Sequence, residues 1–405
     1  MIAVEENPQA VHHADIVVAI PTFNEAAFIG RAVEVVGRGL QEAYPDRSSV
    51  VINCDNASVD GTREAFFQAP TDVPRIYLST DPQRRGKGAN LQMLFGKLRE
   101  LEPKAVLILE VDITNLTPLW VHLFLEPIFR GASYVTPLYM RHKYESTLTS
   151  AVVYPMLRCL YGRRVRQPDA GDCAFSGNLV AKFLEAPAWS EAVATTGIDV
   201  WMAGVALTSR VPVWQTIIGA PKRHRMKDPF AHLGTRFRNV LAAVFDQMAA
   251  YESFWKKVKW SKPTALFNLD GREMDNPPLV EINAGRLHQR FLDGFQENEA
   301  LWRTVFEPAV LNKLDEIRSM PYEHFTFPSQ TWATVLFDAS CAYRRLAPEE
   351  RARLLDSLVP LYLGRVMAYV KRTERMSVQQ AEDYVEETCT IFEESKPYLV
   401  DRWPS

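Results

Sequence analysis

Long apolar runs and paired cysteines are both missing from this chain of 405 residues. No run is long enough to span a bilayer, and the opening stretch MIAVEENPQAVHHAD lacks the basic-then-apolar order of a signal peptide. The five cysteines are odd in number, and no two of them have CxxC spacing (Cys54, Cys159, Cys173, Cys341 and Cys389). We therefore expect a cytoplasmic protein with reduced thiols, and neither a disulfide frame nor a zinc site.

An excess of charge of either sign is also missing. The formal net charge is -3, with 47% apolar and 23% charged residues, which is ordinary globular composition. Nothing in this balance favours binding to nucleic acid or to a membrane. The length exceeds what one ordinary core supports, so two or three domains are expected.

Two common phosphate-binding motifs are absent as well. No GxGxxG follows the first predicted strand, and no GxxxxGK[ST] occurs anywhere in the chain. The sequence therefore supports neither a dinucleotide-binding fold nor a P-loop.

The first half of the chain alternates short apolar runs with helical patterns. Strands are predicted at 16–20, 50–52, 76–78, 106–109 and 213–218, and helices at 27–44, 62–68 and 88–101. This alternation predicts an α/β fold, with a mostly parallel sheet covered by helices on both faces.

The second half reads as helical throughout. Helices are predicted at 230–251, 281–317, 330–345, 348–370 and 377–394, and a proline-containing linker at 263–278. We expect two domains, residues 1–229 and 230–405, and an exposed face of the helical domain could form a homodimer.

Polar clusters follow three of the predicted strands: Pro21-Thr22-Phe23-Asn24-Glu25, residues 55–62, and Glu110-Val111-Asp112. Parallel strands end at one edge of a sheet, where ligands of such folds bind. Asp60 suits the start of a helix, whereas Asp55 ends its strand at the edge where ligands of such folds bind.

A basic, glycine-bearing loop, Arg84-Arg85-Gly86-Lys87-Gly88, opens a predicted helix. Glycines let backbone N–H groups approach an anion, and the helix N-terminus favours negative charge. A solvated basic turn explains this loop about as well. Together with Glu110 and Asp112, which can hold a divalent ion, the loop favours a diphosphate ligand.

These segments, in this order, resemble GT-A glycosyltransferases: PTFNEAAFIG, DNASVDGT, RRGKGAN and EVD. Three later segments narrow the resemblance: QPDAGD at 167–172, TGID at 196–199 and KRHR at 222–225. The set is similar to the retaining synthases of glucosylglycerate, glucosyl-3-phosphoglycerate and mannosylglycerate. The resemblance implies a Rossmann-like GT-A domain over roughly the first 230 residues, followed by a helical C-terminal domain.

The resemblance also implies a role for each matching residue. Donor-binding residues are expected at Pro21, Thr22, Asn24, Glu25, Asp55, Lys87, Glu110, Val111 and Arg225. Metal ligands are expected at Asp112 and His224, catalytic residues at Asp199 and Lys87, and acceptor-binding residues at Arg166, Gln167, Pro168, Gly171 and Asp172. The cofactor would be Mg²⁺ or Mn²⁺. Taken singly, His224 could be a surface histidine and Asp199 a charge at a helix start.

The implied reaction moves glucose or mannose from a GDP- or UDP-sugar to a small anionic acceptor, D-glycerate or 3-phosphoglycerate. Arg163, Arg164 and Arg166 add positive charge before the acceptor loop, although an exposed basic turn is equally consistent with them. Glu110 replaces the first aspartate of the usual DxD motif. Tyr139 and its neighbours Arg141, His142 and Lys143 receive no role.

Two other classes of protein remain open at this point. A sugar-nucleotide pyrophosphorylase also uses acidic metal ligands and a basic glycine loop, but usually directly after the first strand, where this chain has PTFNE. A non-catalytic nucleotide-sugar-binding protein would keep the base and phosphate loops. It would have no need for Asp112, Asp199 and His224 together.

Overall fold

The computed structural model describes residues 2–225, 233–269 and 277–404. The chain divides into two compact units. The first, here called the sheet unit, comprises Met1–Met140, Val165–Ala231 and Pro263–Pro277. The second, the helical unit, comprises Arg141–Arg164, His232–Lys262 and Pro278–Ser405. The expected division at residue 229 remains a proposal, and the compact units differ from it at residues 141–164 and 263–277.

The sheet unit is built on one mixed, mostly parallel sheet in the order β1-β4-β3-β2-β5-β7-β6-β8-β9. Its strands are β1 Ile2–Glu6, β2 Ile16–Thr22, β3 Ser49–Asp55, β4 Arg75–Thr80, β5 Ala105–Ile108, β6 Tyr134–Leu138, β7 Cys173–Ser176, β8 Val213–Ile217 and β9 Ala265–Phe267. Strands β4, β3, β2 and β5 run parallel, whereas β7 lies antiparallel between β5 and β6. The α/β prediction is confirmed, and the five predicted strands are present.

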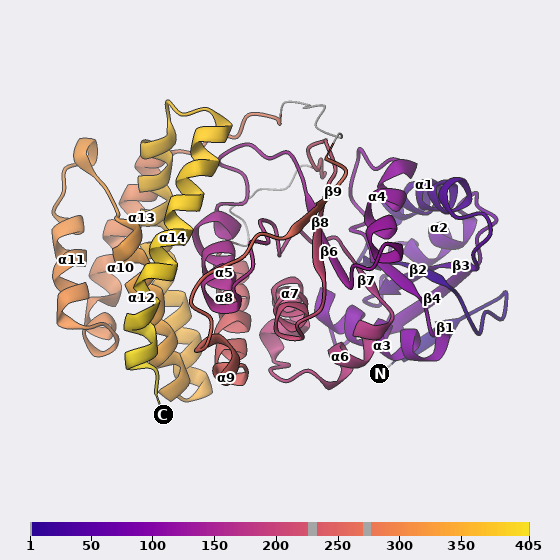
Figure 1. The fold of residues 1–405 in the computed structure, drawn as a ribbon, viewed down its shortest axis with the longest axis horizontal. Helices are drawn as coiled ribbons and strands as arrows, with labels where there is room; N and C mark the ends of the chain where they lie inside the picture. Colours follow the sequence, from indigo (N-terminus) through magenta and orange to yellow (C-terminus); the bar gives the residue numbers. More distant parts are fainter. Residues whose placement is uncertain (1, 226–232, 270–276, 405) are drawn as a thin grey trace. The chain divides into compact units, whose positions relative to one another are not determined.

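Helices pack in two groups around the sheet (Figure 1). Helix α1 (Ala26–Ala43) contacts α2 (Thr62–Gln68) and α4 (Pro118–Phe129), whereas α3 (Lys87–Leu101) contacts α6 (Asn178–Glu185). Helix α7 (Ile198–Thr208) follows a π-helical turn at Val193–Gly197. Strands covered on both faces must be apolar on both sides, which explains the unbroken apolar runs, as in Ile16–Ile20, whose side chains are all buried.

The helical unit contains η1, a π-helical turn (Thr149–Val153), α5 (Tyr154–Tyr161), α8 (Leu233–Ala250) and α9 (Glu252–Trp255). It continues with α10 (Ala284–Val305), α11 (Pro308–Arg318), α12 (Ser329–Arg345), α13 (Pro348–Thr373) and α14 (Val378–Arg402). Within the unit α10 packs on α13, and α14 packs on both α12 and α5 (Figure 1). None of the helices in the described ranges combines the length and apolar character needed to cross a bilayer.

Two predictions in this half were wrong in detail. Residues 265–267 lie in the expected linker, but they form β9 and pair in parallel with β8. The rest of that linker lies partly outside the described residues. The single helix expected at 281–317 is two helices, because the second starts at Pro308, which suits a first helical position.

Candidate active site

The carboxyl ends of β2 and β3 fix the first two predicted segments side by side. Parallel pairing sets Thr22 opposite Asp55, and the Thr22 hydroxyl donates to Asp55 Oδ1 at 2.7 Å. Asp55 is fully buried, and its carboxylate also accepts from Ser58 N–H at 2.7 Å and Tyr77 Oη at 2.9 Å. These bonds fix the Asp55 side chain inside the fold, so contact with a base or ribose requires one of them to open.

The loop after β2 is held by hydrogen bonds to the neighbouring loop. Asn24 has a left-handed φ of 55°, and its Oδ1 accepts from Val59 N–H at 3.1 Å. Asp60 accepts from the N–H groups of Ala26 at 3.0 Å and Thr62 at 3.1 Å, the first residues of α1 and α2. Asp60 therefore ties both helix starts together, and its position agrees with the helix-start role predicted from its sequence.

Three potential metal ligands lie together at the end of β5. Oxygens of Glu110 and Asp112 and a ring nitrogen of His224 lie within 4.8 Å of one another. His224 Nδ1 is 3.2 Å from Asp112 Oδ1 and 4.0 Å from Glu110 Oε2. Two carboxylates and an imidazole form a donor set that suits Mg²⁺ or Mn²⁺, so the cluster supports the expected divalent metal cofactor.

The loop that carries His224 is tied to the chain just after Asp112. Thr114 N–H donates to Arg223 O at 2.8 Å, and Arg223 N–H donates to Asn115 Oδ1 at 3.0 Å. Asn115 Nδ2 in turn donates to Pro221 O at 2.8 Å. Residues more than a hundred positions apart in the chain are thereby held in register, which is why His224 reaches the end of β5.

Arg225 joins this cluster to the loop after β2. Its guanidinium donates to both carboxylate oxygens of Glu25, at 2.8 and 3.1 Å. Its Nε lies 3.7 Å from Asp112 Oδ2. The two predicted donor residues Glu25 and Arg225 are thus paired with each other beside the predicted metal ligands.

Glu110 differs from Asp112 in being held by two lysines. Lys222 Nζ lies 2.7 Å from Glu110 Oε2, and Lys87 Nζ lies 3.5 Å from Glu110 Oε1. Burial alone would raise the pKa of Glu110, but the ammonium groups of Lys222 and Lys87 hold this pKa well below its usual range. Glu110 is therefore ionised and already neutralised by protein charges, whereas Asp112 faces His224.

Lys87 also links the phosphate loop to the expected catalytic aspartate. Its ammonium donates to Asp199 Oδ1 at 2.8 Å and to Gly171 O at 2.7 Å. Burial raises the pKa of Asp199, and the adjacent Lys87 offsets part of that effect. Burial disfavours the charged form of Lys87, yet Asp199 and Glu110 raise its pKa above the usual value, so Lys87 remains a cation.

The two glycines around Lys87 have a packing role. A Cβ on Gly86 would lie 2.5 Å from Ala194 O, and one on Gly88 would lie 2.0 Å from Val193 O. Gly86 also has a φ of +126°, a region that L side chains rarely adopt. The glycines therefore bring α3 against the π-helical turn, and the close approach of backbone to a phosphate stays a prediction.

The predicted acceptor loop forms a buried frame around Glu110. The Gln167 amide exchanges hydrogen bonds with the backbone of Tyr139 at 2.9 and 3.3 Å, and Pro168 is buried beside it. Asp172 accepts from Tyr139 Oη at 2.6 Å and from Glu110 N–H at 2.7 Å. Side chains that are buried and paired in this way shape the wall of a site, and their contact with an acceptor stays a prediction.

Gly171 fits only as glycine. Its φ is +89°, and a Cβ there would lie 2.3 Å from Glu110 Oε1.

The three arginines before the acceptor loop are divided between the two units. Arg166 lies in the sheet unit and donates its N–H to Gln215 Oε1 at 2.7 Å, whereas Arg163 and Arg164 belong to the helical unit.

Sequence reasoning missed two members of this cluster, Lys222 and Tyr139. Lys222 is buried and contacts both Glu110 and Asp172. Tyr139 Oη donates to Asp172, and the Lys222 ammonium lies 5.5 Å from the centroid of the Tyr139 ring. A lysine two positions before a predicted metal-binding histidine was a signal for Lys222. Tyr139 has no such signal, because its partner lies 33 residues away.

The part of the chain that carries the first strands and the acidic segment is similar in sequence to a family of glycosyltransferases. The sequence model of the family Glycosyl transferase family 2 matches residues 17–185, which include β2, β3, β5 and the acidic segment after it. This match supports the predicted glycosyltransferase domain over that part of the chain. The residues in named roles remain predictions.

Solved structures of glucosyl-3-phosphoglycerate synthase from Mycobacterium tuberculosis are similar in fold. The one with Mn²⁺, uridine diphosphate and phosphoglyceric acid has 22% identity and a TM-score of 0.46, over 58% of this chain and 78% of that chain. The one with Mg²⁺ and uridine diphosphate has 21% identity and a TM-score of 0.45, over 58% and 80%. No curated protein matches the sequence.

Proposed function

We propose that this protein transfers a hexose, glucose or mannose, from a nucleoside-diphosphate sugar to D-glycerate, with retention of configuration at the sugar. The observation that carries the proposal is the charged cluster at the end of β5. There, Asp112 and His224 lie beside Glu110. The Lys87 ammonium lies 3.5 Å from Glu110 and 2.8 Å from Asp199, so it links the two carboxylates. The family match over residues 17–185 supports the same class of reaction.

The charges of the cluster suit departure of a nucleoside diphosphate. Breaking the bond between sugar and diphosphate leaves extra negative charge on the leaving group, and its stabilisation is the main electrostatic demand. Asp112 and His224 would hold a divalent ion, which supplies positive charge to the diphosphate when bound. Arg225 lies beside Asp112, and Lys87 and Lys222 lie beside Glu110.

Asp199 is proposed to orient the donor sugar. Its carboxylate is fixed by Lys87 at 2.8 Å, so it can accept hydrogen bonds from sugar hydroxyls without being free to attack. With no enzyme nucleophile, the acceptor hydroxyl would enter on the face that the diphosphate leaves. A phosphate oxygen of the leaving group would then take the hydroxyl proton.

The acceptor is proposed to be a small carboxylate. Of the three arginines before the acceptor loop, Arg166 belongs to the sheet unit. One cation is enough to bind the carboxylate of D-glycerate, whereas 3-phosphoglycerate would need several. 3-Phosphoglycerate is the second candidate, favoured by the other two arginines of the same basic segment.

A matrix of substrates tests the proposal. GDP-, UDP- and ADP-glucose and GDP-mannose are each incubated with D-glycerate or 3-phosphoglycerate, with Mn²⁺ and with EDTA. Metal-dependent formation of a glycosylated acceptor supports the proposal and identifies the donor base and sugar. Pyrophosphate-dependent release of sugar phosphate would instead indicate a pyrophosphorylase. Donor binding without turnover on any acceptor would indicate a non-catalytic protein.

A further inference from the structure

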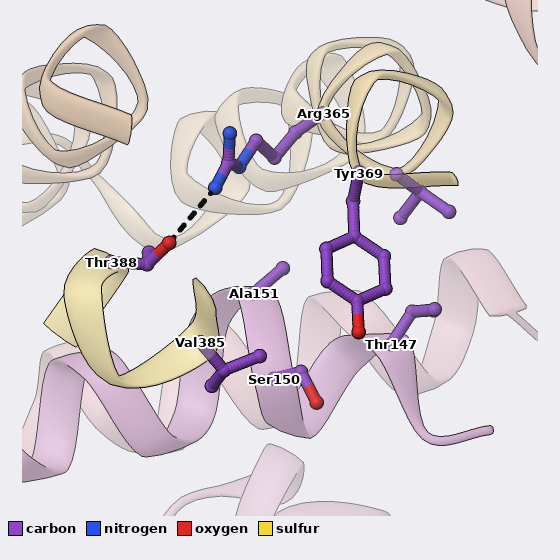
Figure 2. Close-up of a pocket in the computed structure, with 8 residues that line it drawn as sticks. Thr147, Ser150, Ala151, Arg365, Tyr369, Val385 and Thr388 are labelled. Carbon is purple, nitrogen blue, oxygen red and sulfur yellow. Dashed lines mark hydrogen bonds between the residues drawn. The ribbon is translucent and has the colours of Figure 1, made fainter. Parts of the chain in front are cut away.

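A small cavity inside the helical unit is lined by the buried side chain of Arg365. The cavity lies between the Thr147–Ala151 segment and residues of α13 and α14. Figure 2 shows the Arg365 side chain extending from α13 towards Thr388, with both residues among those that line the cavity. Only 3% of Arg365 is exposed to solvent.

The hydrogen-bond partners of this guanidinium within the described ranges are all neutral. One terminal nitrogen donates to Phe327 O at 2.6 Å and to Tyr384 Oη at 3.3 Å. The other donates to Ser329 Oγ at 2.8 Å and to Thr388 Oγ1 at 3.2 Å, the contact drawn in Figure 2. Among the residues that the structure describes, no carboxylate forms an ion pair with Arg365.

A second buried arginine in the same unit shows how this chain otherwise compensates such a charge. Arg158 is 2% exposed, and it pairs with Glu386 at 2.5 Å and with Glu393 at 3.0 Å. Burying a charge is costly unless an opposite charge and hydrogen bonds accompany it. Arg365 has the hydrogen bonds but lacks the opposite charge.

Two further observations identify what is missing at Arg365. Its Nε is buried and has no hydrogen-bond partner in the described part of the chain, and a buried donor left unsatisfied is destabilising. Burial would raise the pKa of the Tyr384 phenol, yet the positive charge of Arg365 brings this pKa below its usual value. The surroundings of the cavity therefore carry both an open donor and uncompensated positive charge.

We propose that this cavity binds one small inorganic anion, of the size of chloride, against the guanidinium of Arg365. The cavity has room for about one particle of water size, which excludes a nucleotide, a sugar or a phosphate ester. A water molecule could accept the Nε hydrogen bond, but it would leave the charge uncompensated. Thr147 and Ser150 line the same space. The anion would be a structural ligand of the helical unit.

Chloride dependence of unfolding tests this site in the full-length protein. Urea unfolding is followed at constant ionic strength while sodium gluconate is replaced by sodium chloride. A ligand that binds only the folded state stabilises it increasingly as its concentration rises above its Kd. The unfolding midpoint of the wild type should therefore rise with chloride, and that of Arg365→Gln should not change.

Tyr384→Phe is the matched control, because it removes a neutral partner of Arg365 and keeps the charge and the cavity. It should retain the chloride response. Crystals of the wild type grown in sodium bromide provide a second measurement that does not require a variant to fold, and an anomalous peak should lie beside Arg365 Nε. The same chloride response in wild type and Arg365→Gln would overturn the proposal, as would an ordinary water molecule at this position in the bromide crystals.

Discussion

Glu110 and Asp112 lie two residues apart, yet their surroundings assign them different tasks. Both oxygens of Glu110 face ammonium groups, at 2.7 Å from Lys222 and 3.5 Å from Lys87. Asp112 instead faces the imidazole of His224 at 3.2 Å. Arg225 Nε lies 3.7 Å from Asp112, farther than the Lys222 ammonium lies from Glu110. A carboxylate that two close lysines already neutralise is a weaker ligand for a cation than one without such close ammonium groups.

We therefore expect the two carboxylates to respond unequally to substitution. Asp112→Asn should abolish Mn²⁺-dependent binding of the donor sugar nucleotide. Glu110→Gln should weaken this binding by about 10–100-fold, a range typical of groups that support a metal ligand without touching the ion. Calorimetric titration of donor into each variant, with Mn²⁺ and with EDTA, measures both effects. Wild-type binding that ignores Mn²⁺ would show that these residues form only a salt-bridged strand end.

Lys87 and Arg84 provide a second comparison between neighbouring residues. Lys87 is mostly buried and points at Glu110 and Asp199, whereas Arg84 is exposed and bonds Gln92 at 3.2 Å. A charge-assisted hydrogen bond is worth about 1.5–3 kcal/mol, so Lys87→Ala should weaken donor binding by about 10–100-fold. Arg84→Ala should change donor binding less than threefold by the same titration. Equal donor affinity in wild type and Lys87→Ala would place the diphosphate elsewhere.

At the scale of elements, helix α3 carries two glycines with opposite surroundings. A Cβ on Gly88 would meet Val193 O at 2.0 Å, whereas one on Gly96 would meet no atom within 4 Å. Because backbone cannot move aside as a flexible side chain can, Gly88→Ala should destabilise the protein by about 1–3 kcal/mol. Gly96→Ala should stabilise it by about 0.5–1 kcal/mol, because alanine favours the helical state.

Urea unfolding of both variants measures these changes, and donor titration adds a functional readout. Gly88→Ala shifts α3 away from the π-helical turn that precedes Asp199, so we expect it to weaken donor binding as well. Gly96→Ala should leave donor binding unchanged. Similar stabilities of the two variants would mean that α3 does not pack closely against the Val193–Gly197 turn.

The elements that sequence reasoning predicted well are those whose pattern is local. Buried strands such as β2 and β3 show as apolar runs, and α12 and α14 show as helical stripes. Strand β9 was missed because its three residues gain their hydrogen bonds from β8, about fifty residues earlier. In the site, the polar ends of the strands were visible, but the pairing of Lys222 with Glu110 and Asp172 depends on long-range packing.

At the scale of the whole molecule, the two units are interleaved along the chain. Residues 141–164 leave the sheet unit between β6 and β7 and contribute α5 to the helical unit. Helix α5 packs against α14, at the far end of the sequence. No local sequence pattern predicts that residues 141–164 belong to the helical unit, because a helix within an α/β region has the same pattern whichever unit it joins. The buried pairs Arg158–Glu393 and Lys396–Cys159 fix α5 to α14.

Lys396 makes the stability of this packing dependent on pH. Its ammonium is buried, donating to Cys159 O at 2.8 Å and to Val258 O at 2.7 Å, and burial lowers its pKa to about 8 from an ordinary value of 10.5. Between these values the folded chain has released a proton that the unfolded chain still binds. The contribution of Lys396 to the free energy of unfolding therefore rises as the pH increases from about 8 to 10.5. The same contribution is lost when the pH returns to about 8.

We expect the difference in stability between wild type and Lys396→Met to shift by about 3 kcal/mol in favour of the wild type between pH 7.5 and pH 10.5. Urea unfolding at several pH values measures this shift, and the difference cancels the titration of groups common to both proteins. The two carbonyls left without a donor lower the stability of the variant at every pH, so the slope of the difference is decisive. Lys313→Met removes an exposed lysine paired with Glu316, and its difference from wild type should stay level over the same range. If the stability difference between wild type and Lys396→Met also stayed constant from pH 7.5 to pH 10.5, Lys396 would have its ordinary pKa. Its ammonium would then not be buried between α5 and α14.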